Sequence, residues 1–185
     1  MSVRNWRGRV FIGTSLDGFI AKPDGDLTWL TNPVARSHQA TASETPGLEW
    51  ETFIPAIDAV VMGRTTYETV LGFEAWPFAE LTVIVLSTTL QQSPHASVAR
   101  SLDEATTMLN DAGAREVYID GGTVVQASLA AGLVDEITVS IAPVLIGSGA
   151  KLFGALPDDV LLTLLGHHST PDDGLVRITY AVEHA

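Results

Sequence analysis

Three short apolar runs, each followed by a segment with helix-forming character, are the feature that most restricts the fold of this chain. The runs cover residues 59–62, 81–87 and 117–119, and Val, Ile and Leu dominate them. Continuous apolar runs of this length are typical of strands that are buried on both faces, as in parallel sheets. Helices between such strands cover the faces of the sheet, so the pattern predicts an α/β fold.

Helix-start signals agree with this alternation. Residues 101–113 carry apolar side chains at helical spacing, with Ser101 placed to cap the first turn. Thr65 and Glu68 have the same capping-box spacing, which predicts a helix that ends near Gly72. The other expected elements are a strand over 9–14, a turn and helix start over 24–30, helices over 50–58 and 123–131, and strands within 134–146, 160–166 and 175–184.

Beyond residue 132 the pattern changes to strands without helices between them. The last run alternates, so Val176, Ile178, Tyr180 and Val182 are expected to share one face. The predicted fold class is therefore α/β, with a mixed, mostly parallel central sheet flanked by helices and antiparallel strands at the C-terminal end. The 185 residues fit a single domain over 1–185.

Charge and composition argue against several classes of function. The formal net charge of −12 disfavours binding to nucleic acid or to anionic membranes. The absence of cysteine excludes disulfides, thiol catalysis and cysteine metal ligands. No apolar run reaches the length of a membrane span, and the first residues do not form a secretory signal. We expect a cytoplasmic protein.

The loops that follow the three apolar strands are rich in glycine and hydroxyl side chains. They cover residues 63–65, 87–89 and 121–123, and parallel strands end at one edge of a sheet. Glycines let a phosphate approach the backbone, and helix N-termini offer amide donors. Arg64 supplies the cation that a phosphate needs in so acidic a chain. Each loop alone could be an ordinary turn, whereas the three together favour a phosphate site. The chain has neither a Walker loop nor a G-x-G-x-x-G motif.

Asp26 is the candidate for proton chemistry, because it stands where a helix is expected to begin. Two interpretations stay open. It could cap that helix, which contributes about 1 kcal/mol. It could instead face the cleft, where a carboxylate can hydrogen-bond substrate or assist protonation. Asp17, in a predicted tight turn, and Trp29, one turn after Asp26, are further candidates for contact with substrate.

A metal site is not expected. His167 and His168 are adjacent and so project differently, and the stretch that joins them to Asp172 and Asp173 is interpreted as a loop. Ser148, between two glycines, lacks the spacing of a nucleophile elbow and is interpreted as part of a turn.

Several motifs resemble a known family when they are taken in order. VVMGRTTYE, VIVLSTT, VYIDGGTVV and GDLTWL resemble motifs of dihydrofolate reductases. TSLDGFIA and APVLIGSGAKLF make the chain more similar to the reductase domain of bacterial riboflavin biosynthesis and its stand-alone relatives. The resemblance covers roughly residues 8–182. It implies a dihydrofolate-reductase-like fold and NADPH-dependent hydride transfer to a C=N or C=O group of a small polar, heterocyclic substrate of pyrimidine or pterin type.

The resemblance also implies roles for individual residues. The pyrophosphate would lie on Gly121, Gly122, Thr123 and Val124. The adenosine side would contact Gly63, Arg64, Thr65 and Ser87, with Arg64 and Ser87 near the 2′-phosphate. The nicotinamide would be bordered by Gly13, Ile20 and Ala21, and Asp26 matches in position an acidic substrate-binding residue. Relatives of this kind form homodimers, and the last strand with residues 144–149 could supply an interface.

The chain departs from both patterns in two places. Residues 31–49 do not match a folate-binding region, so folate is not the expected substrate. The chain lacks the cysteines of the zinc deaminase domain that accompanies the riboflavin-pathway reductase. Three alternatives to the reductase stay open: a nucleotide-binding protein of the same fold without turnover, a true dihydrofolate reductase, and a structural dimer without a ligand.

Overall fold

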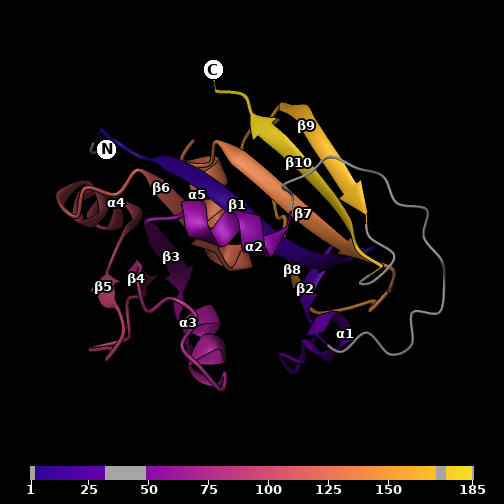
Figure 1. Cartoon of the computed structure of the whole chain (residues 1–185), viewed down its shortest axis with the longest axis horizontal. Helices are drawn as coiled ribbons and strands as arrows, with labels where there is room; N and C mark the ends of the chain where they lie inside the picture. The colour runs from indigo at the N-terminus through magenta and orange to yellow at the C-terminus, as the bar shows by residue number, and fades with distance from the viewer. Residues whose placement is uncertain (1–2, 32–48, 170–173, 185) are drawn as a thin grey trace.

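An eight-stranded sheet runs through the molecule in the order β5-β4-β3-β6-β1-β7-β10-β9 (Figure 1). The computed structural model describes residues 3–31, 49–169 and 174–184. Strands β5 to β7 in that order pair in parallel, and β10 and β9 are antiparallel to their neighbours. This confirms the predicted mixed sheet. The strands are β1 (Arg7–Ser15), β3 (Ala59–Gly63), β4 (Thr82–Leu86), β5 (Ser97–Ala99), β6 (Glu116–Asp120), β7 (Glu136–Ala142), β9 (Leu162–Ser169) and β10 (Val176–Val182).

Helices cover both faces of the parallel strands, which explains why those strands are apolar throughout. On one face, α2 (Trp50–Phe53), the short 3-10 helix η1 (Ile54–Ala56) and α3 (Arg64–Leu71) pack against alternate residues such as Val60 and Met62. On the other face, α4 (Leu102–Asp111) and α5 (Gly122–Ala130) pack against Val61 and Ile119. Each strand therefore contributes side chains to two hydrophobic clusters.

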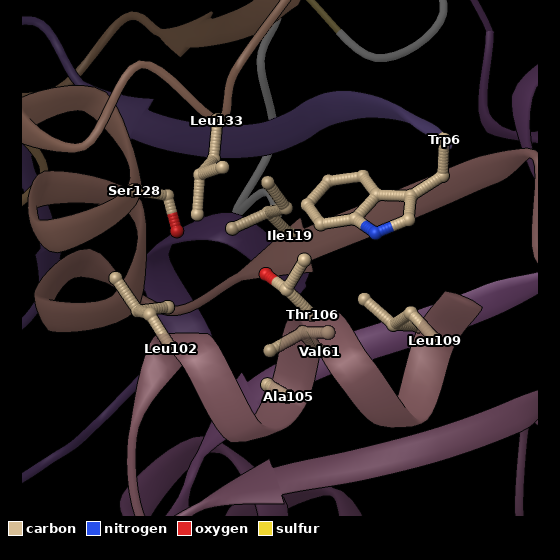
Figure 2. Close-up of a pocket in the computed structure, with 9 residues that line it drawn as sticks. All are labelled: Trp6, Val61, Leu102, Ala105, Thr106, Leu109, Ile119, Ser128 and Leu133. Atoms are coloured by element: carbon tan, nitrogen blue, oxygen red, sulfur yellow. The ribbon is translucent and has the colours of Figure 1, made fainter. Parts of the chain in front are cut away.

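A small cavity lies between α4, α5 and the sheet (Figure 2). Its volume is about 10 Å³, which is room for one water molecule at most. Trp6 closes one side, and its indole Nε1 has no hydrogen-bond partner among the described residues. The lining is otherwise nearly all apolar, so we interpret the cavity as a packing gap of the core.

Two helix predictions need correction. The helix expected over 50–58 is split into α2 and η1, because Pro55 stands in the first turn of η1. The capping box of Thr65 and Glu68 is wrong, since α3 begins at Arg64 and its N-cap is Gly63, which has no side chain. In contrast, Ser101 caps α4 as predicted, accepting a hydrogen bond of 3.1 Å from the Glu104 N–H.

Three short strands were not expected from the sequence. One is β5, and the other two, β2 (Phe19–Ala21) and β8 (Ala150–Lys151), form a separate two-stranded sheet. A further helix, α1 (Thr28–Thr31), begins two residues after Asp26. The loop expected at His167 and His168 is wrong, because both residues lie within β9.

Two observations limit the classes of site. Among the described residues, no group of three or more His, Asp or Glu side chains could hold a metal ion; Asp172 and Asp173 lie outside this part of the chain, as do residues 32–48. The helices of the described ranges include none long and apolar enough to cross a bilayer.

Candidate active site

The ends of three neighbouring strands bring the predicted phosphate loops together. Gly63 is the register partner of Leu86, and Met62 is the partner of Asp120, so the loops after β3, β4 and β6 are adjacent. The contact is close: a Cβ atom built on Gly121 would lie 2.3 Å from Thr66 Oγ1. The glycine at this position lets α3 and the start of α5 touch.

The first three amides of α5, at this edge, have no hydrogen-bond partner among the described residues. Gly121 is the N-cap, with a φ of +85° that disfavours other residues. The Val125 N–H makes a helical bond to Gly121 O at 2.9 Å, so the amides of Gly122, Thr123 and Val124 precede the first helical hydrogen bond. Such amides, with the positive end of the helix dipole, can bind a phosphate.

Gly122 has a second role in packing. A Cβ atom there would lie 2.7 Å from the carbonyl oxygen of Lys151 in β8 and 3.0 Å from Ile20 Cδ1 in β2. Gln126 of α5 also donates to the carbonyl oxygens of Lys151 and Leu152, at 3.1 and 3.0 Å. The two-stranded sheet is therefore fastened to α5, and a larger residue at position 122 would disturb this packing as well as any ligand.

The residues predicted for the adenosine side lie at the corner next to α3. Arg64 is exposed and forms an ion pair with Glu68 at 3.2 Å, and Thr65 beside it is also exposed. Val124 packs near Gly63, with 3.4 Å between Val124 Cγ2 and a Cβ atom built on the glycine. A phosphate that binds Arg64 would compete with the Glu68 carboxylate.

Ser87 shapes the neighbouring loop. It is buried, and its hydroxyl oxygen accepts hydrogen bonds from the amides of Thr89 and Leu90, at 3.3 and 3.0 Å. Arg100 Nη1 donates to the carbonyl oxygens of Ser87 and Leu90, both at 2.7 Å. The loop after β4 is thus held in one conformation by its own polar groups.

The sheet opens between β1 and β6 towards this edge. Pairing of the two strands ends at Arg9 and Tyr118. Beyond that point β1 stays paired with β7 as far as Ser15, while β6 stays paired with β3 as far as Asp120. In the opening, the Tyr118 hydroxyl donates a hydrogen bond of 3.0 Å to the Phe11 carbonyl oxygen. After β1 the chain forms β3, β4 and β5, each farther from β1, and it then returns to form β6 and β7 on either side of β1. The place where the strand order reverses in this way is where α/β proteins bind ligands.

The residues predicted to border a nicotinamide lie on β1 and β2. A Cβ atom on Gly13 would lie 2.5 Å from Leu30 Cδ2, so β1 passes directly beneath α1. Ile20 reaches Gly122, as described above. The Ala21 carbonyl oxygen is 1.9 Å from a Cβ atom built on Gly149, so no larger residue fits at 149. Strand β2 therefore lies between α5 and the loop after β7.

Asp17 fastens two loops together. Its carboxylate accepts hydrogen bonds from the Ser15 hydroxyl at 2.6 Å and from the amides of Gly147 and Ile146, at 2.8 and 3.3 Å. The Ser15 hydroxyl is the main cause that holds the pKa of Asp17 below its usual value, and the two amides add to it. These bonds already occupy the carboxylate. The structure contains no substrate contact that tests the predicted role of Asp17, which stays a prediction.

Asp26 is held by an ion pair and by the start of α1. It accepts from Lys22 Nζ at 2.6 Å, and from the amide and hydroxyl of Thr28 at 3.0 and 2.8 Å. Lys22 first, and Thr28 next, lower the pKa of Asp26 to about 2. The carboxylate is therefore ionised at neutral pH and has no proton to donate, although it can accept hydrogen bonds. Trp29 lies beside it, donating from Nε1 to the Asp26 carbonyl oxygen at 3.2 Å.

Asp120 is a polar residue of the opening that the sequence reasoning did not select. It is half-buried, and its Oδ1 accepts the Gly121 N–H at 2.8 Å. Burial raises the pKa of Asp120 to about 6, against the opposing effects of the Gly121 amide and the nearby Tyr118 hydroxyl. The available signal was an acidic residue at the end of an apolar strand, directly before two glycines.

Comparison with known proteins places the chain in a family. The family described as RibD C-terminal domain matches residues 8–176. A putative riboflavin biosynthesis protein from Shewanella sp. PV-4 is 32% identical, with a TM-score of 0.80 over 96% of this chain and 99% of that one. The uncharacterized protein YwjB of Bacillus subtilis strain 168 is 29% identical over 162 residues, which cover 85% of this chain and 88% of that protein.

The fold has a wider relationship. Dihydrofolate reductase from Enterococcus faecalis, solved with NADP(H) and RAB-propyl, is 18% identical, and the TM-score is 0.67 over 98% of both chains. At this identity the likeness shows the fold alone, which is dihydrofolate-reductase-like as predicted. The family match extends over most of the chain and over the whole of the site described above, and the protein therefore belongs to the RibD C-terminal domain family.

Proposed function

We propose that the protein is an NADPH-dependent reductase that transfers a hydride to a C=N or C=O group of a small polar heterocycle of pyrimidine or pterin type. The opening between β1 and β6, directly beside the unpaired amides of α5, carries this proposal. Membership of a reductase-type family supports it, as does a shared fold with a reductase that was solved with NADP(H).

The residues at the opening fit a nicotinamide nucleotide. The amides of Gly122, Thr123 and Val124 would hold the pyrophosphate, and β2 with Ile20 and Ala21 would border the nicotinamide. When bound, the cofactor supplies the hydride. The chain itself orients the two reactants and keeps water out, with Leu30 over Gly13 and β2 against α5 as the covering groups.

Arg64 is the residue that would distinguish NADPH from NADH. Its guanidinium is exposed at the corner beside Ser87, where the 2′-phosphate is expected, and Glu68 competes for it. Arg64→Ala should remove the preference for NADPH. Glu68→Gln, which keeps size and frees the guanidinium, should increase that preference. An unchanged preference in both variants would leave Arg64 without a cofactor role.

Titration with NADPH, followed by tryptophan emission, tests the proposal first, because Trp29 is on α1, next to the Leu30 that covers Gly13 of β1. We expect saturation below millimolar NADPH. Oxidation of NADPH is then followed with aminopyrimidines, pterins including dihydrofolate, and cyclic imines. Binding without oxidation would favour a nucleotide-binding protein, and a strong preference for dihydrofolate would favour a dihydrofolate reductase. No saturable binding would contradict the proposal and favour a structural protein.

We also propose that the protein forms a homodimer through β9. This strand stands at the edge of the sheet (Figure 1). The side chains of Leu162, Leu164 and Leu165 on it are exposed. An open edge with leucines suits pairing with a second copy. Light scattering after gel filtration should give twice the chain mass, and Leu164→Lys should give a monomer. A monomeric wild-type protein would contradict this proposal.

A further inference from the structure

We propose that a groove at the side of the sheet where β1 and β7 begin binds the phosphate group of a small molecule. The groove has a volume of about 640 Å³, which is within the usual range of small-molecule sites. It is lined by Arg4, Asn5, Trp6, Arg7, Arg115 and Asp135. The groove lies at the other end of β6 from Asp120, so this site does not depend on the proposed reductase function.

The lining carries an excess of positive charge, with three arginines against one aspartate. In a chain with a formal net charge of −12 and ten basic residues, this is a local reversal of sign. The aspartate is already neutralised, because Asp135 accepts hydrogen bonds from Arg4 at 2.6 and 2.7 Å and from the Gly8 amide at 2.7 Å. A groove lined by one sign of charge concentrates small ions of the opposite sign.

Arg115 is the cation of this groove with the most donors to offer. Its main chain is fixed, since its amide donates to Asp58 Oδ2 at 3.0 Å and its carbonyl oxygen accepts the Arg7 N–H at 2.7 Å. Its side chain is exposed, and its guanidinium makes no hydrogen bond or ion pair with the residues that the structure describes. All five N–H donors of the guanidinium can therefore bind a ligand.

Arg7 retains donors as well. Its Nη2 donates to Glu136 Oε2 at 2.7 Å, while the other oxygen of Glu136 accepts hydrogen bonds from Arg9. One carboxylate is thus shared by two guanidinium groups. The Arg7 side chain is 45% exposed, and its Nε and Nη1 have no partner within the described ranges. The further carboxylate of Glu116 approaches Arg9 at 3.8 Å and does not line the groove.

Two guanidinium groups with available donors match a phosphate group in charge and in geometry. A phosphate dianion has three oxygens beyond its ester bond, and arginine binds such oxygens in pairs. Trp6 contributes an aromatic ring to the lining, and the Arg4 guanidinium lies over this ring at 5.4 Å from its centroid. The ligand class is therefore phosphate, and its two sources, inorganic phosphate and an organic phosphomonoester, are distinguished by the experiment.

The indole N–H signal of Trp6 in a ¹H–¹⁵N correlation spectrum gives a local readout, because Trp6 lines the groove. The other three tryptophans, Trp29, Trp50 and Trp76, serve as internal references. Titration with sodium phosphate or phenyl phosphate at constant ionic strength should shift the Trp6 signal, with a dissociation constant of about 1 mM or below. Tighter binding of phenyl phosphate would identify a phosphomonoester as the ligand, and equal or weaker binding would identify inorganic phosphate.

Arg115→Gln should weaken this binding by about 10-fold or more, since it removes charge-assisted hydrogen bonds to the ligand. Arg7→Gln should also weaken it. Arg64→Gln is the matched control, because it removes an exposed arginine beyond the end of β3 and should leave the Trp6 titration unchanged. No saturable shift of the Trp6 signal, or equal affinity in wild type and Arg115→Gln, would overturn the site. Neither result bears on NADPH binding, which is titrated separately.

Discussion

The two sides of the central sheet on which its parallel strands begin and end differ in their charged groups. We call the side where β1 and β7 begin the amino edge, and the side where β3, β4 and β6 end the carboxyl edge. At the amino edge, Glu136 accepts hydrogen bonds from both Arg7 and Arg9, and Asp135 forms a two-pronged ion pair with Arg4. At the carboxyl edge, Asp120 has no such partner among the described residues, and it accepts a hydrogen bond from the Gly121 amide at the start of α5. Ion pairs are concentrated at one edge, and the proposed site is at the other.

The comparison shows how so acidic a chain could bind a phosphorylated cofactor, as proposed above. Three of its ten basic residues hold its own acids at the amino edge, far from the site. The proposed site would rely on backbone amides, which bind anions without adding a titrating group. A carboxyl group left without a cation there carries an energetic cost, which is typical of functional groups with displaced pKa values.

Glu136→Gln should have the largest effect on stability. It removes a buried charge from between two arginines, and we expect a loss of about 2–4 kcal/mol in the free energy of unfolding, measured by urea denaturation. Glu116→Gln is the matched control. Its carboxylate is 3.8 Å from Arg9, so the loss should stay below about 1 kcal/mol. NADPH affinity should be unchanged in both variants. Equal losses of unfolding free energy in the two variants would mean that the buried position of Glu136 between two arginines adds nothing to stability.

Gly121→Ala should destabilise the carboxyl edge almost as much. The left-handed backbone costs about 1–2 kcal/mol for alanine, and the new Cβ atom would press against Thr66 Oγ1. Gly113→Ala is the control, because Gly113 also has a positive φ but open space around it. We expect a larger loss at 121 than at 113 in thermal unfolding, together with loss of NADPH binding. Similar losses would mean that the contact with α3 is easily relieved.

Asp120→Asn, unlike the two preceding variants, should stabilise the protein at neutral pH. The folded carboxyl group, with a pKa of about 6, binds its proton more tightly than the unfolded one at 3.8. Wild-type stability should therefore fall as pH rises from about 4 to 6, and the variant should escape this fall. The gain at pH 7 should be about 1–3 kcal/mol, with none at pH 3.5. A gain of the same size at both pH values would contradict the displaced pKa.

Asp26→Asn should give the smallest change, with the opposite dependence on pH. Because the pKa of Asp26 is lowered to about 2, its ion pair stabilises the protein above pH 4 and loses that effect as pH falls towards 2. Urea midpoints of wild type and variant should therefore differ at pH 6 and converge near pH 2. If the difference in urea midpoint between wild type and Asp26→Asn grew as the pH fell, the pKa of Asp26 would not be lowered, and its pH dependence would not be opposite to that of Asp120.

Sequence alone was enough for the parts of the fold that depend on pattern. The apolar runs at 59–62, 81–87 and 117–119 became β3, β4 and β6, and the periodic segment after Ser101 became α4. The short strands β2, β5 and β8 were missed because two or three residues are too few to show the alternation of apolar and polar side chains that marks a strand. They exist because a partner strand lies beside them, and that depends on tertiary structure.

The site was predictable to a similar extent. The convergence of the three loops follows from parallel strands, and the structure brings Gly63, Thr66 and Gly121 into contact. The state of the carboxyl groups could not be predicted, because it depends on neighbours that are distant in sequence or on burial. Lys22 lowers the pKa of Asp26 to about 2, whereas burial raises the pKa of Asp120 to about 6.

The ends of the described chain meet at one carboxylate, and this makes the protein a candidate for circular permutation. Arg4 and His184 both bind Asp135, at 2.6 and 2.8 Å, and Arg4 Nη2 is 3.5 Å from His184 Nε2. A short linker between the two ends would leave that edge intact. New ends in the exposed turn after Gly72 would separate α3 from β4 in the chain order, while the strands around the opening would keep their neighbours in space.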